Sequence, residues 1–143
     1  MEENIFSGIK KEEIRLPLDI LGEYKESFNQ AFHNKLMFET NDTLESGQSE
    51  WAKLDMFNEV KEPEEKKFVT RVSIFAPELN NYRMLLLKVS YKRSKVYPCE
   101  LYNALTDKSE NCNDDTKFDE SLKKIFLSEE FKKPVRMLLS QIG

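Results

Sequence analysis

The residues that could do metal or nucleophilic chemistry are few, and their spacing matches no site of that kind. The only histidine, His33, follows an apolar-periodic segment, and the only cysteines are Cys99 and Cys112. A zinc site needs three or four His, Cys or carboxylate ligands at matched spacing, which these residues do not supply. A dyad of His33 with either cysteine stays open, because such partners meet in space rather than in sequence. The better expectation is a surface histidine that complements the end of a helix.

Acid–base and cofactor chemistry have similarly little support in the sequence. Glu100 lies between Cys99 and Leu101 in an apolar stretch, so it is a candidate general acid or base if it is buried. Its alternative role is that of an edge-strand side chain facing water. The chain has only four glycines and contains no P-loop, dinucleotide-binding fingerprint or serine-hydrolase elbow. We therefore predict no catalytic residue, no cofactor and no metal ligand. A small enzyme with a pocket near the central sheet, lined by Glu100, Cys99 or His33, is kept as an alternative.

Length and composition predict one folded domain over residues 1–143, with residues 1–15 as a loosely ordered arm. The chain is 39% hydrophobic and 11% aromatic, which is enough to build a core. Its longest apolar run, residues 84–87, is far shorter than the roughly 20 residues that cross a bilayer. No export signal is visible at the N-terminus. We therefore expect a cytoplasmic protein without membrane contact, in which both cysteines are reduced thiols.

The apolar periodicity that could position any site predicts an α+β fold with an N-terminal helix, an antiparallel sheet of 3–5 strands and two C-terminal helices. Turn-forming residues and short connections argue that neighbouring strands run antiparallel. Residues 106–116 read as a polar, flexible connection, and residues 51–60 as a short helix or a loop pinned by Trp51. Helix starts are expected at Thr116 and at Ser128. The expected first helix and four strands cover residues 17–33, 36–40, 68–76, 82–91 and 96–105.

One hydrophobic core is expected to join these elements. Each of its predicted members lies on the apolar face of its helix or strand. Truncating such a side chain to alanine should cost about 2–5 kcal/mol if it is buried. The predicted core includes Phe28, Leu87, Val89, Leu122 and Leu138.

The sheet is the most promising surface, because its charge is opposite to that of the rest of the chain. Residues 68–98 hold six basic residues and one acidic residue, so they carry +5 within a chain of net charge −4. Strand alternation places Val72, Ile74, Leu85, Leu87 and Val89 toward the helices. The opposite face would then combine apolar, aromatic and basic side chains, a mixture that protein interfaces favour. The predicted partner-binding residues on that face are Arg71, Phe75, Met84, Leu86 and Lys88.

These observations predict a non-enzymatic, small acidic protein that acts by binding another macromolecule, as an adaptor, an inhibitor or an immunity-type protein. The partner would be a second protein or another copy of the chain. A single-stranded nucleic acid bound to the basic sheet face is a further alternative. The acidic net charge of −4 argues against that alternative.

Overall fold

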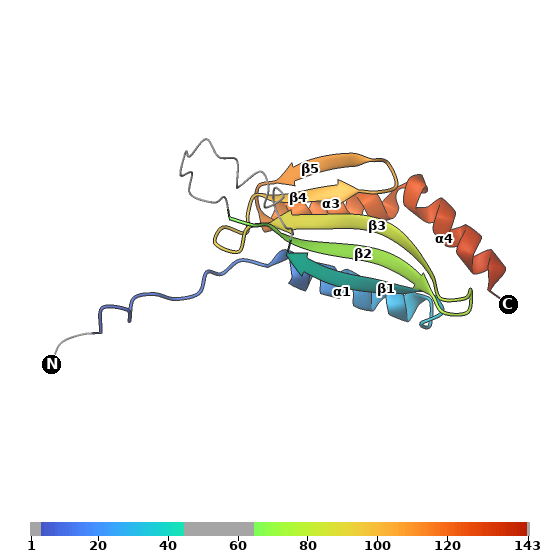
Figure 1. Cartoon of the computed structure of the whole chain (residues 1–143), viewed down its shortest axis with the longest axis horizontal. Helices are drawn as coiled ribbons and strands as arrows, with labels where there is room; N and C mark the ends of the chain where they lie inside the picture. The colour runs from blue at the N-terminus through green and yellow to red at the C-terminus, as the bar shows by residue number, and fades with distance from the viewer. Residues whose placement is uncertain (1–3, 45–64, 143) are drawn as a thin grey trace, which may run out of the picture.

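The structure is a computed structural model that describes residues 4–44 and 65–142 of the 143-residue chain. In this part the chain forms a helix, a five-stranded antiparallel sheet in the order β1-β2-β3-β4-β5, and two further helices (Figure 1). The predicted α+β arrangement is confirmed. The elements are α1 (Pro17–Ala31), β1 (Met37–Leu44), β2 (Phe68–Ala76), β3 (Tyr82–Tyr91), β4 (Cys99–Asn103), β5 (Lys108–Cys112), α3 (Asp115–Leu127) and α4 (Glu129–Gln141).

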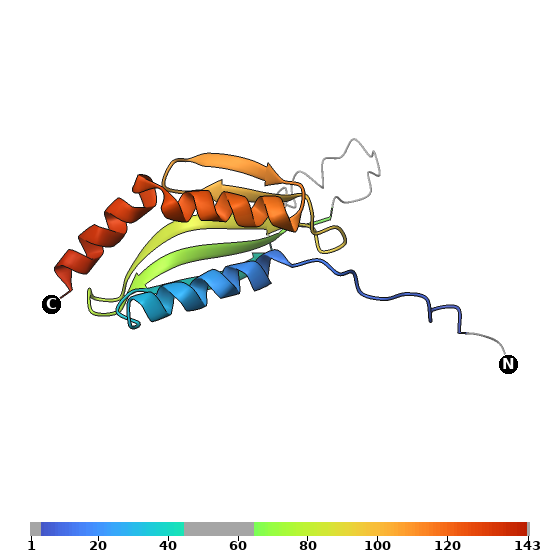
Figure 2. The same cartoon turned by 180° about the vertical axis from the view of Figure 1, so that it is seen from behind.

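The molecule has two layers, a sheet and a layer of helices on one side of it. Seen from the sheet side, α1 and α3 lie behind the strands, and from the other side they lie in front (Figures 1 and 2). α1 contacts β1, and α3 contacts β4 and β5. We call the sheet surface that points away from the helices the outer face. Its central and charged residues are Glu39, Arg71, Phe75, Arg83, Lys88, Glu100 and Tyr102.

Helix starts follow local side-chain chemistry. Pro17 occupies the first turn of α1, where its missing N–H would have had no partner. The Asp114 side chain accepts a hydrogen bond from the Lys117 N–H at 2.8 Å and caps α3. The predicted cap at Ser128 is confirmed, since its hydroxyl accepts from the Phe131 N–H. The cap of α3 is Asp114 and not Thr116, so the helix begins two residues earlier than a cap at Thr116 would place it.

The core lies between the sheet and the helices. All five residues predicted for it are buried, and they belong to one cluster of buried side chains. At the end of the core nearest α4, four aromatic rings from both layers meet, and the rings of Phe28 and Phe38 are stacked with centroids 4.0 Å apart. This burial explains why the helices remain on one side of the sheet only. The aromatic rings are Phe28, Phe38, Phe126 and Phe131.

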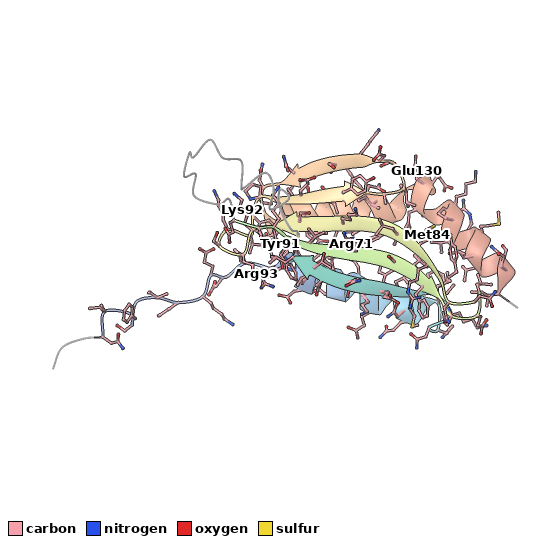
Figure 3. The ribbon with its side chains drawn as sticks, viewed as in Figure 1. Arg71, Met84, Tyr91, Lys92, Arg93 and Glu130 are labelled. Carbon is pink, nitrogen blue, oxygen red and sulfur yellow. The ribbon has the colours of Figure 1, made fainter. Side chains whose placement is uncertain are left out.

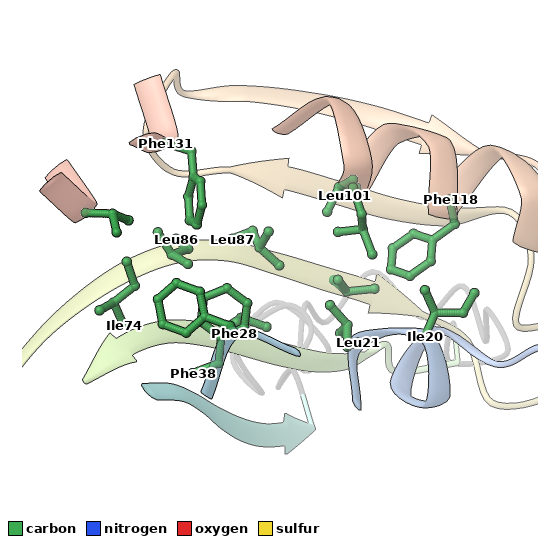
Figure 4. Close-up of a cluster of buried hydrophobic side chains, with 14 of the residues drawn as sticks. Ile20, Leu21, Phe28, Phe38, Ile74, Leu86, Leu87, Leu101, Phe118 and Phe131 are labelled. Carbon is green, nitrogen blue, oxygen red and sulfur yellow. The ribbon is translucent and has the colours of Figure 1, made fainter. Parts of the chain in front are cut away.

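A β-bulge corrects the predicted orientation of part of β3. Val72 pairs with Leu87, but the next residue of β2, Ser73, pairs with Leu85, so Leu86 is an extra residue in β3. Leu86 and Leu87 are both fully buried in the core (Figure 4). Beyond the bulge the alternation is reversed relative to the sequence expectation.

The outward placement of Leu86 and Met84 was therefore wrong. Met84 pairs with Ile74, a core residue, and packs against the core from the helix side. Leu85, which was expected to point inward, pairs with Ser73 and lies on the outer face. The cause is the single inserted residue, which shifts every earlier side chain of β3 to the other face.

Other differences concern strand limits. β1 continues to Leu44, through residues expected to form a turn, and the fourth strand is the shorter segment Cys99–Asn103. The polar connection after it contains β5, which the sequence analysis missed. The helix or loop expected at residues 51–60 lies outside the described residues. Among the helices described, none has the length and apolar character needed to cross a bilayer.

Candidate interaction surface

Three of the five predicted partner-binding residues lie together on the outer face. Arg71 and Phe75 alternate with core residues along β2, and Lys88 lies on β3 directly opposite Arg71. Figure 3 shows Arg71 on the side of the sheet that faces away from the helices. Met84 and Leu86 do not belong to this group, because the bulge turns both toward the helices.

Arg71 and Lys88 bring two positive charges into register on adjacent strands. The Arg71 guanidinium donates a hydrogen bond to the Thr43 hydroxyl at 2.9 Å. The Lys88 ammonium lies 5.7 Å from the centroid of the Tyr102 ring, within cation–π range. Within residues 4–44 and 65–142 no carboxylate lies within ion-pair distance of either group. Like charges directly opposite each other destabilise a sheet, so this pair needs an explanation other than stability.

The two cations border a shallow hollow of about 490 Å³ on the outer face. The acidic residue of the hollow is Glu100, which extends from β4. Its carboxylate lies 3.9 Å from the Lys67 ammonium. The remaining lining combines apolar side chains with the hydroxyl residues Thr43 and Ser90, so an anion that enters meets both kinds of surface. The hollow is lined by Thr43, Leu44, Val69, Arg71, Lys88, Ser90, Glu100 and Tyr102.

A second cationic group on the outer face is already neutralised. Arg83 forms an ion pair with Glu39 at 2.9 Å, and its guanidinium carbon lies 4.4 Å from the centroid of the Phe75 ring. The ring of Phe75 is therefore partly covered by Arg83. Among the outer-face cations of the described residues, Arg71 and Lys88 are the two without an ion pair.

Tyr102 was not predicted as a site residue, although it forms one wall of the hollow. Its hydroxyl donates a hydrogen bond to the Asp107 carboxylate at 2.7 Å, and this bond is the main reason that the pKa of Tyr102 is raised. The bond also holds the ring beside Lys88. Alternation within β4 could have placed Tyr102 on the same face as Glu100, but its position opposite Lys88 depends on a register that the sequence does not reveal.

The candidate catalytic residues are not brought together. His33 is exposed and lies in the turn before β1, near the Phe75 end of β2. Glu100 pairs with Ser90 at the opposite end of the sheet. Cys99 is buried on the helix side, whereas its neighbour Glu100 lines the hollow of the outer face. The suggested dyad is therefore not formed, and of the three residues suggested for a pocket only Glu100 lines the hollow.

Comparisons of this chain with protein-family models, with curated proteins and with solved structures found no match. Its function therefore has to be inferred from the chemistry of the surface. What the outer face offers is a hollow with two adjacent positive charges, an aromatic wall and apolar edges. Such a surface can hold a carboxylate while burying the apolar groups around it.

Proposed function

We propose that this protein acts by binding an acidic partner protein through its outer face, as an adaptor, an inhibitor or an immunity-type protein. The observation that carries the proposal is the cross-strand pair of Arg71 and Lys88, which borders the hollow. A partner carboxylate between these two groups would convert a repulsive arrangement into two charge-assisted hydrogen bonds.

The surroundings of the pair support a protein partner. Leu44, which is 57% exposed, and Tyr102 supply apolar and aromatic surface beside the cations, and protein interfaces favour such a mixture of aromatic, apolar and arginine side chains. Glu39 and Glu100 lie on the same face and would repel a continuous row of phosphates. A polyanion is therefore a poorer fit than an isolated carboxylate within an apolar patch.

The test is a comparison of captured proteins across three forms of the chain. Wild-type protein, Lys88→Glu and the control Lys123→Glu are immobilised and exposed to a nuclease-treated lysate of the native host. Lys123 is exposed on α3, so its substitution makes the same charge change on the helix side. A protein retained by the wild type and the control but lost from Lys88→Glu would support the outer face. Equal retention by all three forms would contradict the proposed role of the outer face. Binding that is seen in an untreated lysate and is lost after nuclease treatment would also contradict a protein partner.

A further inference from the structure

The N-terminal arm, residues 4–16, presents an unusual amount of apolar surface to solvent. Five of the nine large hydrophobic side chains exposed in the described residues belong to it. Ile5, Phe6 and Ile9 are 85%, 66% and 76% exposed, and the segment from Asn4 to Ile9 contains no charged residue. In a chain of which 34% is charged, such a segment is a candidate for contact with another surface.

The arm is held at its base and shaped at its tip. The Arg15 N–H donates to the Asp115 carboxylate at 2.9 Å, and the Tyr97 hydroxyl donates to the Arg15 carbonyl at 2.7 Å. At the tip, the Asn4 side chain accepts a hydrogen bond from the Phe6 N–H, and the Phe6 carbonyl accepts from the Ile9 N–H at 3.0 Å. The three apolar side chains are thus presented on a formed turn, which lowers the entropy lost on docking.

A groove of about 430 Å³ lies between α4 and the turn that joins β2 to β3. Among the residues that the structure describes, no charged one lines this groove. Its exposed apolar residues are Tyr82 and Met137, which are 44% and 60% exposed. The groove is lined by Leu79, Asn80, Tyr82, Met84, Pro134, Met137, Leu138 and Gln141.

From this match we infer that the arm of one copy docks into the α4 groove of a second copy. The uncharged tip of the arm and the uncharged groove are complementary in chemistry. Burying Ile5, Phe6 and Ile9 against Tyr82 and Met137 removes large apolar side chains of both surfaces from water.

The three apolar side chains of the arm cannot all enter the groove of their own chain. Arg15 is fixed beside Tyr97, close to the end of β3 at Tyr91, whereas the groove lies at the other end of this 10-residue strand, about 30 Å away. Ile9 lies six residues before Arg15, and a fully extended chain of that length spans only about 20 Å. With its base in place, Ile9 therefore cannot enter the groove of its own chain, and the three apolar side chains of the arm can dock together only into the groove of another molecule.

The position of the two surfaces sets the kind of assembly. The arm leaves one end of the long axis, and α4 with the C-terminus lies at the other end (Figures 1 and 2). Contact between the arm of one copy and the groove of another produces head-to-tail chains or a closed ring, or a symmetric dimer if two copies exchange arms reciprocally. This association is separate from the outer face and from the partner proposed for it.

The test is sedimentation velocity of the full chain over a range of concentrations up to about 1 mM. Phe6→Asp and Met137→Asp should each weaken self-association by about 30-fold or more, the loss that follows from removing a central interface residue. Leu127→Asp is the matched control, because Leu127 is 64% exposed on α3 outside the groove. Thermal melts of all variants show whether each retains the fold.

A mixture provides the decisive result. Phe6→Asp keeps an intact groove and Met137→Asp keeps an intact arm, so an equal mixture should form dimers and nothing larger. Wild-type protein that stays monomeric at every concentration would overturn the inference. It would also be overturned by association that persists in either variant, or by a mixture that does not dimerise.

Discussion

Cys99 and Cys112 lie directly opposite each other on β4 and β5, and both side chains are buried on the helix side of the sheet. The hydrogen bond between the two thiols and their burial raise the pKa of Cys99 well above its usual range. A thiol with a raised pKa has little thiolate, which is the form that reacts with electrophiles and binds metals.

We therefore expect slow alkylation of Cys99 in the folded protein. At pH 8 its reaction with iodoacetamide should be at least about tenfold slower than that of a free cysteine, because one unit of pKa changes the thiolate fraction about tenfold. In guanidinium chloride without reductant, both Cys99 and Cys112 should react. Mass spectrometry of the labelled peptides measures this. Fast labelling of Cys99 in the native state would contradict the buried pair.

Leu85 and Leu86 provide a direct test of the bulge. Leu86 is fully buried in the core, and Leu85 lies half-buried on the outer face. Leu86→Ala should lower the free energy of unfolding by about 2–5 kcal/mol, and Leu85→Ala by less than half as much. Urea denaturation of both variants measures the difference. The reverse order would mean that β3 has an uninterrupted alternation. For the same reason, Leu86→Asp should unfold the protein instead of removing a contact from its surface.

Asp119 links α3 to α1 and to the base of the arm. Its carboxylate accepts hydrogen bonds from the Tyr24 hydroxyl and from Arg15, and these bonds lower its pKa, with Tyr24 as the larger cause. The folded state therefore favours the ionised form. The resulting stability is present above the pKa of about 3.9 of an unfolded aspartate and is lost as the pH falls through the lower folded value.

Asp119→Asn should thus lower the free energy of unfolding at pH 7 by about 1–2 kcal/mol, a value reduced from the usual range because the side chain is 31% exposed. The difference from wild type should shrink as the pH falls from 4 to 2. Tyr24→Phe should remove part of the same pH dependence. Urea denaturation at several pH values measures both effects, and a difference that is constant with pH would rule out the ionised carboxylate as its source.

The sequence predicted the fold class because most elements bury one continuous apolar stripe. Ile74 and Val72 in β2, and Phe118 and Leu122 in α3, recur with the period of their element and are all buried. β5 gave no such signal. Its residues Lys108–Cys112 are exposed except for Cys112, so the strand has no apolar pattern. Pairing with β4 and contact with α3 define it instead.

The candidate site was only partly predictable for a related reason. Alternation is uninterrupted in β2, so Arg71 and Phe75 were placed correctly on the outer face. In β3 the bulge lies between Lys88, which was placed correctly, and Met84, which was not. The neighbours of the cations, Thr43 and Tyr102, follow from strand register, which local sequence does not determine when several pairings bury the same apolar residues.

Lys88→Glu separates the binding role of the cation pair from any structural role. The substitution places a carboxylate opposite Arg71, so a repulsive cross-strand pair becomes attractive. We expect the free energy of unfolding to stay constant or to rise by about 0.2–1 kcal/mol, with a smaller gain at high salt. Affinity for the acidic partner should fall at the same time, because the new charge repels it.

Urea denaturation and partner titration, each at 50 and 500 mM NaCl, measure the two effects. A residue kept for stability would give the opposite result, with a less stable protein and unchanged binding. Loss of binding together with unchanged stability would mean that Lys88 serves a partner and not the fold, and greater stability of the variant would mean that Lys88 also costs the fold stability.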